Sequence, residues 1–239
     1  MIVLSGLDLE EIADRYLNDA RDPRPDRPWV TLGMISSVDG SAVVDGGSTA
    51  LGGPPDRAVF RALRAVSDVV LTGASTVRAE RYRAPRLPDR LEAWRRSQGL
   101  SLAPRVAVVS NTLDLDLTDS LKEDRPIILT SLSAPPRRVE ELATHAEVVV
   151  AGVDRVDLVE GLAELRRRGV GRVVLEGGPR LNGQMTGLLD EACVTISPTI
   201  AAGEGQRIIV GGEGVPTTRL DRMIESDGFL LLRYLVGVS

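Results

Sequence analysis

Residues 171–189 read GRVVLEGGPRLNGQMTGLL, in which a short apolar strand runs into two adjacent glycines and then into a predicted helix. Because glycine lacks a side chain, a phosphate can approach the backbone closely at Gly177 and Gly178, and the first amides of the helix can point toward it. The pattern indicates a candidate cradle for a nucleotide diphosphate. It is equally typical of a tight strand-to-helix turn, and the following residues do not match the dinucleotide fingerprint G-x-G-x-x-G.

The composition is that of a globular protein with a sizeable core. The chain has 239 residues, of which 43% are hydrophobic, so it can form one large domain or two small ones. Only 3% of the residues are aromatic and the net charge is −5, which argues against nucleic acid as a partner. With one cysteine, Cys193, and one histidine, His145, we expect no internal disulfide and no bound metal. Cys193 is expected in the core and His145 at the surface.

The N-terminus carries no targeting signal that we can identify. The first residues, MIVLSGLDLEE, lack a basic region and soon become acidic, and no apolar run approaches the length of a membrane span. We therefore expect a cytoplasmic protein without a membrane partner.

Apolar strands alternate with amphipathic helices along most of the chain. A helix is predicted over 8–20, followed by a proline-rich linker over 22–28. The predicted strands are 29–35, 68–72, 105–109, 126–130, 147–151, 172–175 and 192–197. The predicted helices between them are 55–66, 136–144, 156–168 and 180–189. The C-terminal ESDGFLLLRYLVGV predicts one further long strand, antiparallel and at an edge of the sheet.

This alternation predicts the α/β class, with a mixed, mostly parallel central sheet flanked by helices. We expect a short N-terminal extension over 1–27, consisting of the helix and linker, and a single domain over 28–239.

Three loops follow predicted strands, where ligands of open α/β sheets bind. The first, 36–53, contains the turn Asp39-Gly40 and is long enough to fold over a ligand or to be a flexible excursion. The second, 72–86, offers small residues followed by Thr76 and by four arginines, Arg78, Arg81, Arg83 and Arg86. The arginines fit either a phosphate clamp or a solvated face. The third loop contains the diglycine, preceded by Glu176, which can hydrogen-bond a sugar or pyrimidine or simply solvate the strand end.

Together the three loops resemble one family. The patterns S-x-D-G at 37–40, L-x-G-A-x-T-V-x-A at 71–79 and V-x-x-EGGP-x-L at 173–181 are similar to those of the pyrimidine reductases of riboflavin biosynthesis. That resemblance covers about residues 28–238 and implies a fold similar to dihydrofolate reductase. In many bacteria this reductase is fused to a zinc deaminase, whose H-x-E and P-C-x-x-C motifs are absent from this chain. The chain therefore resembles a stand-alone reductase.

The resemblance implies hydride transfer from NADPH to the ribosyl carbon of 5-amino-6-(5-phosphoribosylamino)uracil, giving the ribitylamino product. It also implies a homodimer. The implied cofactor contacts are Ala50, Gly73, Ala74, Thr76, Glu80, Ser110, Gly177, Gly178, Pro179, Arg180, Leu181 and Asn182. The implied substrate contacts are Ser48, Arg64, Arg83, Arg86 and Glu176. Asp39 and Glu176 are the candidates for a catalytic group that assists protonation.

One segment departs from the family pattern. Where the family often has A-D-D-P, this chain has Ala79-Glu80-Arg81-Tyr82, and Tyr82 and Ala84 replace a proline and a leucine expected to shape the substrate pocket. Two alternatives therefore stay open. The protein could reduce another heterocycle, such as dihydrofolate, or bind a nucleotide without turnover.

Overall fold

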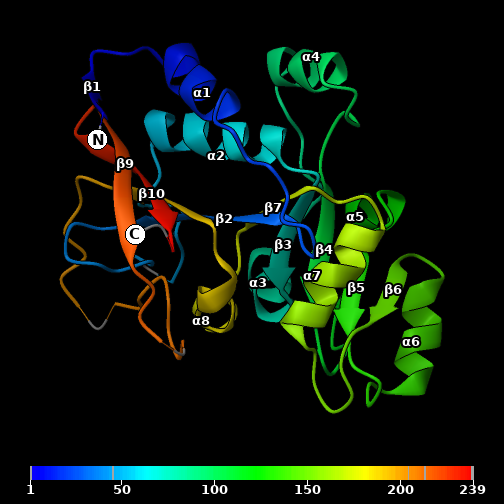
Figure 1. Cartoon of the computed structure of the whole chain (residues 1–239). Coiled ribbons are helices and arrows are strands. Elements are labelled where there is room, and N and C mark those ends of the chain that lie inside the picture. The colour runs from blue at the N-terminus through cyan, green and yellow to red at the C-terminus, as the bar shows by residue number, and fades with distance from the viewer. Residues whose placement is uncertain (1, 45, 204, 213, 238–239) are drawn as a thin grey trace. The chain divides into compact units, whose positions relative to one another are not determined.

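The structure is a computed structural model that describes residues 2–44, 46–203, 205–212 and 214–237. The described residues group by their contacts into two compact units (Figure 1). The first unit consists of the described residues within 1–20, 30–66 and 179–239. The second consists of residues 21–29 and 67–178. Both units combine helices with a sheet, which confirms the α/β class.

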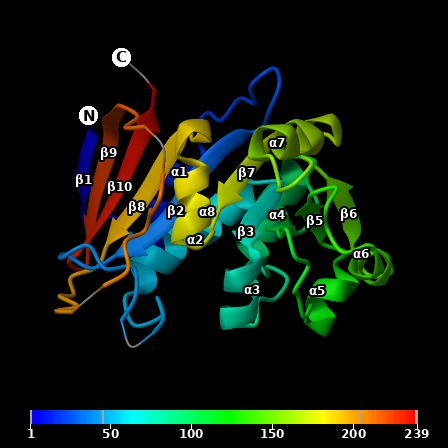
Figure 2. The ribbon, with the colours of Figure 1, turned by 90° about the horizontal axis from the view of Figure 1, so that it is seen from below.

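The first unit contains a mixed sheet. Its strands are β1 (Ile2–Ser5), β2 (Trp29–Ser36, of which Trp29 falls in the second unit), β8 (Glu191–Ile196), β9 (Thr218–Ser226) and β10 (Phe229–Val236). They lie side by side in the order β1-β9-β10-β8-β2 (Figure 2). The pairs β1–β9 and β2–β8 are parallel, whereas β10 is antiparallel to both of its neighbours.

The C-terminal strand prediction was wrong in one respect. The apolar segment is antiparallel as expected, but β10 lies inside the sheet, between β9 and β8. A hairpin turn at Asp227-Gly228, where both residues have positive φ, joins it to β9, which the sequence did not predict as a strand. The sequence of β9 lacks the apolar alternation of a strand because Arg222, which pairs with Asp19, occupies one of its buried positions.

Helices α1 (Leu9–Leu17) and α2 (Pro54–Val66) pack together in the first unit. The start of α1 is fixed by a capping box, since Asp8 accepts from the amides of Glu10 and Glu11, and Glu11 accepts from the amide of Asp8. The apolar face of α1 is buried and α2 in turn contacts β10. The predicted helix 180–189 is instead a short helix, α8 (Pro179–Gln184), followed by a 3₁₀ turn over Thr186–Leu188.

The second unit contains a parallel sheet. Its strands are β3 (Val69–Gly73), β4 (Arg105–Val109), β5 (Ile127–Thr130), β6 (Glu147–Val150) and β7 (Arg172–Leu175), in the order β7-β3-β4-β5-β6. The neighbouring strands β7–β3, β3–β4, β4–β5 and β5–β6 are parallel, so their carboxyl ends share one edge. Its helices are α3 (Ala74–Glu80), α4 (Asp89–Ser97), α5 (Asp119–Glu123), α6 (Pro136–Ala143) and α7 (Leu158–Arg167). Of these helices, α3, α4 and α5 are not among the helices predicted from the sequence.

Cys193 is buried on β8, as predicted, where its thiol donates to Glu191 Oε1 at 3.2 Å. His145 follows α6 and is exposed. Within the described part of the chain, no helix has both the length and the apolar character needed to cross a membrane.

Candidate active site

The carboxyl edge of the parallel sheet in the second unit brings together two of the three predicted loops. Glu176 and the diglycine follow β7, and Gly73 ends the neighbouring strand β3. The amide of Glu176 donates to the carbonyl of Leu71 at 2.9 Å, which extends the pairing of the two strands by one residue. The second and third loops therefore start from a common, rigid support.

The diglycine lies against the start of α3. A Cβ added to Gly178 would lie 3.2 Å from Thr76 Oγ1 and 3.8 Å from Ser75 Oγ. Gly73 is the N-cap of α3 and has no side chain with which to cap the first amides. The result is a wall of small residues and hydroxyl groups, in which a ligand can approach the backbone closely.

Glu176 is held at this edge by a tyrosine. Tyr82 donates its hydroxyl hydrogen to Glu176 Oε2 at 2.7 Å, and both residues are only 7% exposed. Tyr82 departs from the family pattern, but its contact with Glu176 was not predicted from the sequence. These residues are 94 positions apart.

The remaining predicted residues of the second unit differ in accessibility. Ser110 is buried after β4, and its hydroxyl accepts from the amide of Leu113 at 3.0 Å. Glu80 is exposed at the end of α3. Arg83 and Arg86 are exposed in a segment without helix or strand. Exposed guanidinium groups are compatible with a phosphate contact.

In the first unit, Asp39 holds a loop together. Its carboxylate accepts from the amides of Ala201 and Ala202, each at 3.0 Å, and from the hydroxyl of Ser37 at 2.5 Å. The hydrogen bonds from Ala201, Ser37 and Ala202 lower the pKa of Asp39 to about 2. At neutral pH Asp39 is therefore a carboxylate with no proton to give, which argues against the proton-donor role expected for it.

The predicted residues of α8 divide into accessible and buried ones. Pro179 is half-buried and Arg180 is exposed, whereas Leu181 and Asn182 are buried. Asn182 donates through Nδ2 to the carbonyl of Ile208 at 2.8 Å, so its side chain holds the segment that packs against α8. The expected cofactor contact of Asn182 stays a prediction.

The other predicted residues of the first unit lie in a turn and on α2. Ser48 accepts through its carbonyl from the amide of Leu51 at 3.0 Å, and Ala50 is exposed. Arg64, in the last turn of α2, places its guanidinium 4.3 Å from the centre of the Phe60 ring.

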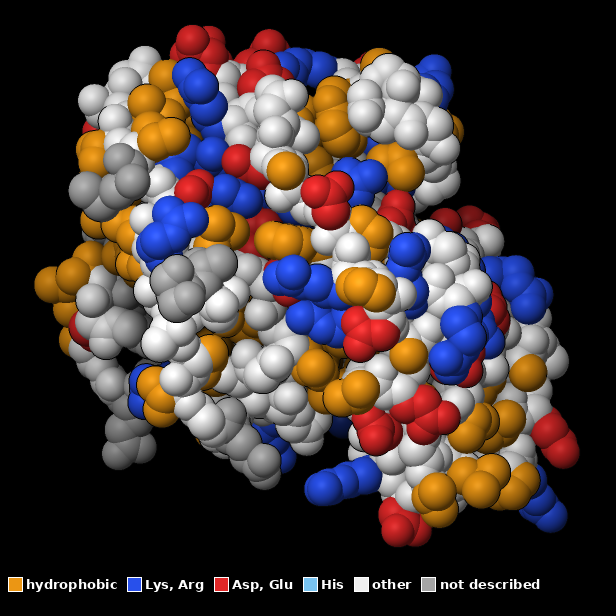
Figure 3. Space-filling view, in the orientation of Figure 1, with side chains coloured by type: hydrophobic (Ala, Val, Ile, Leu, Met, Phe, Trp, Pro, Cys, Tyr) orange, Lys and Arg blue, Asp and Glu red, His pale blue; other side chains and the backbone are white. Residues whose placement is uncertain are grey.

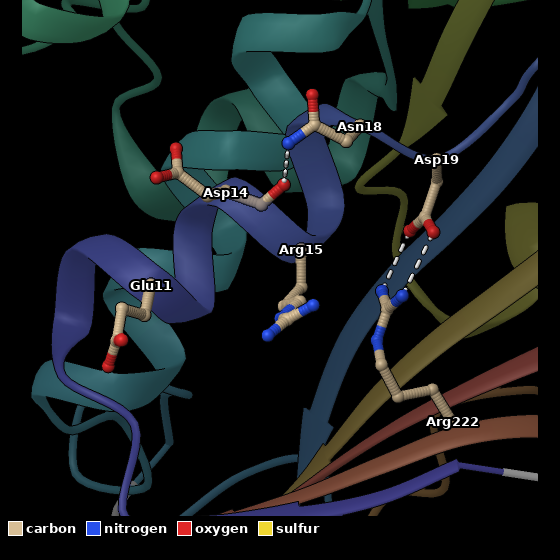
Figure 4. A pocket seen from close by; sticks show the side chains of 6 residues that line it. All are labelled: Glu11, Asp14, Arg15, Asn18, Asp19 and Arg222. Atoms are coloured by element: carbon tan, nitrogen blue, oxygen red, sulfur yellow. Dashed lines mark hydrogen bonds and ion pairs between the residues drawn. The ribbon is translucent and has the colours of Figure 1, made fainter.

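A cavity of about 370 Å³ lies in the first unit between α1 and β9 (Figure 4). It is lined by Glu11, Asp14, Arg15, Asn18, Asp19 and Arg222, none of which was predicted as a site residue. Asp19 and Arg222 close one side through a bidentate ion pair with distances of 2.9 and 2.7 Å. On the face seen in Figure 3, acidic and basic side chains are interspersed.

Comparison with known proteins places these features in a family. The family model described as the RibD C-terminal domain matches residues 28–227. The chain is 38% identical, over 79% of its length and 86% of the relative's, to 2,5-diamino-6-ribosylamino-4(3H)-pyrimidinone 5′-phosphate reductase of Methanothermobacter thermautotrophicus. It is 32% identical to the protein of the same name from Aquifex aeolicus, over 79% of this chain and 85% of that one.

A solved structure agrees with the fold. The crystal structure of a pyrimidine reductase-like protein from Corynebacterium diphtheriae matches with a TM-score of 0.78 and 24% identity, covering 90% of this chain and 94% of that one. The family model spans most of this chain, and the sequence relatives are similar over nearly their whole length. The chain therefore belongs to the RibD C-terminal domain family.

Proposed function

We propose that this protein is an NADPH-dependent reductase that converts the ribosylamino group of a pyrimidine 5′-phosphate to a ribitylamino group in riboflavin biosynthesis. The observation that carries the proposal is the close approach of Gly178 to the hydroxyl groups of Thr76 and Ser75, in a chain of this family. A side chain at Gly178 would fill the space in which a diphosphate meets the backbone, so the residues present fit a dinucleotide.

In this proposal the second unit holds the cofactor through Gly73, Ala74, Thr76 and the diglycine. When bound, the reduced nicotinamide supplies a hydride. The first-unit contacts expected from the resemblance, Ala50 and the accessible Pro179 and Arg180, stay predictions. So do the substrate contacts Ser48 and Arg64.

Glu176 is the group proposed to face the substrate. The ribosylamine opens to an imine, whose carbon accepts the hydride and whose nitrogen takes a proton to give the amine. A buried carboxylate at this position can hydrogen-bond the reacting amine and orient it, while water supplies the proton. The low pKa of Asp39 and the loop amides that it holds argue against a proton-donor role for it in this step.

Two substrates fit the proposal and differ at one ring position. The relatives named above act on the 2,5-diamino-pyrimidinone, which keeps an amino group at position 2. The substrate expected from the sequence resemblance is the uracil, which has an oxygen there. Both carry the same ribosylamino phosphate.

The test is steady-state oxidation of NADPH, and of NADH in parallel, with each of these substrates and with dihydrofolate. The proposal expects turnover with at least one ribosylamino substrate and a higher kcat/KM with NADPH. Turnover with dihydrofolate alone would make the protein a reductase of another heterocycle. Binding of NADPH without turnover would leave only a nucleotide-binding function.

The proposal also includes a homodimer. On one face of the sheet in the first unit, half-exposed apolar side chains continue across three strands: Leu232 of β10, Val194 of β8 and Met34 of β2 are adjacent in register. A second copy that covers this row would remove apolar surface from water. Light scattering after size exclusion should give twice the mass of the chain.

A further inference from the structure

We infer that Tyr82 is a positioning residue, whose hydroxyl fixes the carboxylate of Glu176 in the orientation needed for reduction of the substrate. The inference rests on the proposed function and adds a residue to it.

The contact between the two side chains is short and protected from water. Tyr82 is 7% exposed and Glu176 is 7% exposed, and the hydroxyl hydrogen is donated to Oε2 across 2.7 Å. A hydrogen bond to an ionised group is stronger than one between neutral groups, and it is strengthened further where water is excluded. The hydroxyl therefore defines where one carboxylate oxygen lies.

The backbones of both partners are anchored. Glu176 is tied to β3 through the carbonyl of Leu71, and the amide of Tyr82 donates to the carbonyl of Val77 at 3.1 Å. Thr118 donates its hydroxyl to the carbonyl of Tyr82 at 2.9 Å. A tyrosine held at both its amide and its carbonyl can act as a rigid support for the carboxylate.

The chain turns sharply to bring the ring to this place. Arg81, the C-cap of α3, has φ 46°, in the left-handed region that non-glycine residues seldom adopt. With Arg81 in this conformation, α3 ends at Glu80, and the chain that follows brings Tyr82 to Glu176 at the carboxyl edge of the sheet. The unfavourable backbone conformation is therefore coupled to the placement of the tyrosine.

The expected effect is on the reduction step and not on cofactor binding. Glu176 can orient the reacting amine only while its own carboxylate is fixed, and small displacements of a positioning group lower the rate steeply. Removing the hydroxyl leaves the ring, and hence the packing, in place. The diglycine and Thr76, which are proposed to hold the cofactor, do not change.

The experiment compares Tyr82→Phe, Glu176→Gln and the double variant with the wild-type enzyme, under saturating NADPH and the ribosylamino substrate. We expect Tyr82→Phe to lower kcat about tenfold, the size of one charge-assisted hydrogen bond, with KM for NADPH unchanged. Because the hydroxyl acts through Glu176, the double variant should be no slower than Glu176→Gln alone. Tyr16→Phe, which removes a buried tyrosine hydroxyl from α1, is the matched control and should retain full kcat.

Four results would overturn the inference. An unchanged kcat for Tyr82→Phe, or losses that multiply in the double variant, would overturn it while leaving the proposed function intact. A fall in kcat accompanied by a fall of more than about 5 °C in the unfolding midpoint would assign Tyr82 to stability. A wild-type enzyme that reduces no ribosylamino substrate would overturn the proposed function and this role together.

Discussion

Gly178 is the residue at which a side chain would intrude most directly on the proposed cofactor site. A Cβ there would already lie 3.2 Å from Thr76 Oγ1, and the branches of valine would extend into the space beyond. We expect Gly178→Val to raise KM for NADPH about tenfold or more, equivalent to about 1.4 kcal/mol of binding. Steady-state kinetics at saturating substrate measure this change.

The matched control for that variant is Gly187→Val. Gly187 is exposed and has nothing within 4 Å of an added Cβ, so the valine meets open space. We expect it to leave KM for NADPH unchanged. Equal KM values for the two variants would mean that the diglycine is only a turn.

Asp39 gives a prediction about pH. Because its pKa is lowered from 3.8 to about 2, its carboxylate contributes to folding above about pH 4, and this contribution is lost as the pH falls toward 2. Asp39→Asn should therefore lower the unfolding midpoint at pH 7, with a difference from wild type that shrinks between pH 4 and pH 2. Thermal unfolding across this range measures it.

The same variant tests the chemical role of Asp39. A group that is fully ionised at neutral pH does not titrate during turnover, so the pH dependence of kcat between pH 6 and pH 8 should be the same in Asp39→Asn and wild type. A change in its shape would return Asp39 to the list of catalytic groups.

At the residue scale, the sequence indicated which positions are small but not which side chains meet them. Two glycines after a strand predicted a candidate phosphate cradle, and the structure places Thr76 against Gly178. The pairing of Tyr82 with Glu176 could not be predicted, because it depends on the adjacency of β3 and β7. Nor did the sequence show that Asn182 points to Ile208.

Among the elements, strands with continuous apolar runs were predicted well and those with buried charges were not. β3 and β5 are fully buried and read as unbroken apolar segments. β9 carries a buried arginine at an inward position, which interrupts the alternation expected of a strand. In α4, Arg95 is 1% exposed and donates to the carbonyls of Ser67 and Ser101, so a buried position again looks polar in the sequence.

The attachment of α1 to the sheet gives a prediction about stability. The side chains of Asp19 and Arg222 are 11% and 7% exposed, and Asp19 also lies 3.2 Å from Arg233. Asp19→Asn would leave buried arginine charge uncompensated, which should lower the free energy of unfolding by about 3 kcal/mol. Urea unfolding measures the change.

Glu92→Gln, which breaks an exposed ion pair on α4, is the control for Asp19→Asn. Glu92 pairs with Arg96 on α4 at 3.9 Å, with side chains 28% and 61% exposed, so its loss should lower the free energy of unfolding by less than about 1 kcal/mol. If Asp19→Asn were as mild, the ion pair would not be what holds α1 to the sheet.

For the whole molecule, the fold class followed from the alternation of apolar strands with amphipathic helices, and the family followed from the order of three motifs along the chain. Each motif alone fitted a turn as well as a site, but strand-end loops in this order and spacing match one family over residues 28–227. The division of the described residues into two units was not predicted, because it depends on contacts between distant segments such as 1–20 and 179–239. The proposed substrate rests on the similarity of this chain to named reductases and on no single residue.

The central claim is that hydride passes from the nicotinamide to the ribosyl carbon of the substrate. The most direct measurement uses NADPH with deuterium at both C4 positions, so that the result does not depend on which face of the nicotinamide reacts. Mass spectrometry of the product should show one deuterium, and NMR should place it on the ribityl carbon attached to nitrogen. A ribitylamino product without deuterium, or deuterium elsewhere in the molecule, would contradict the account.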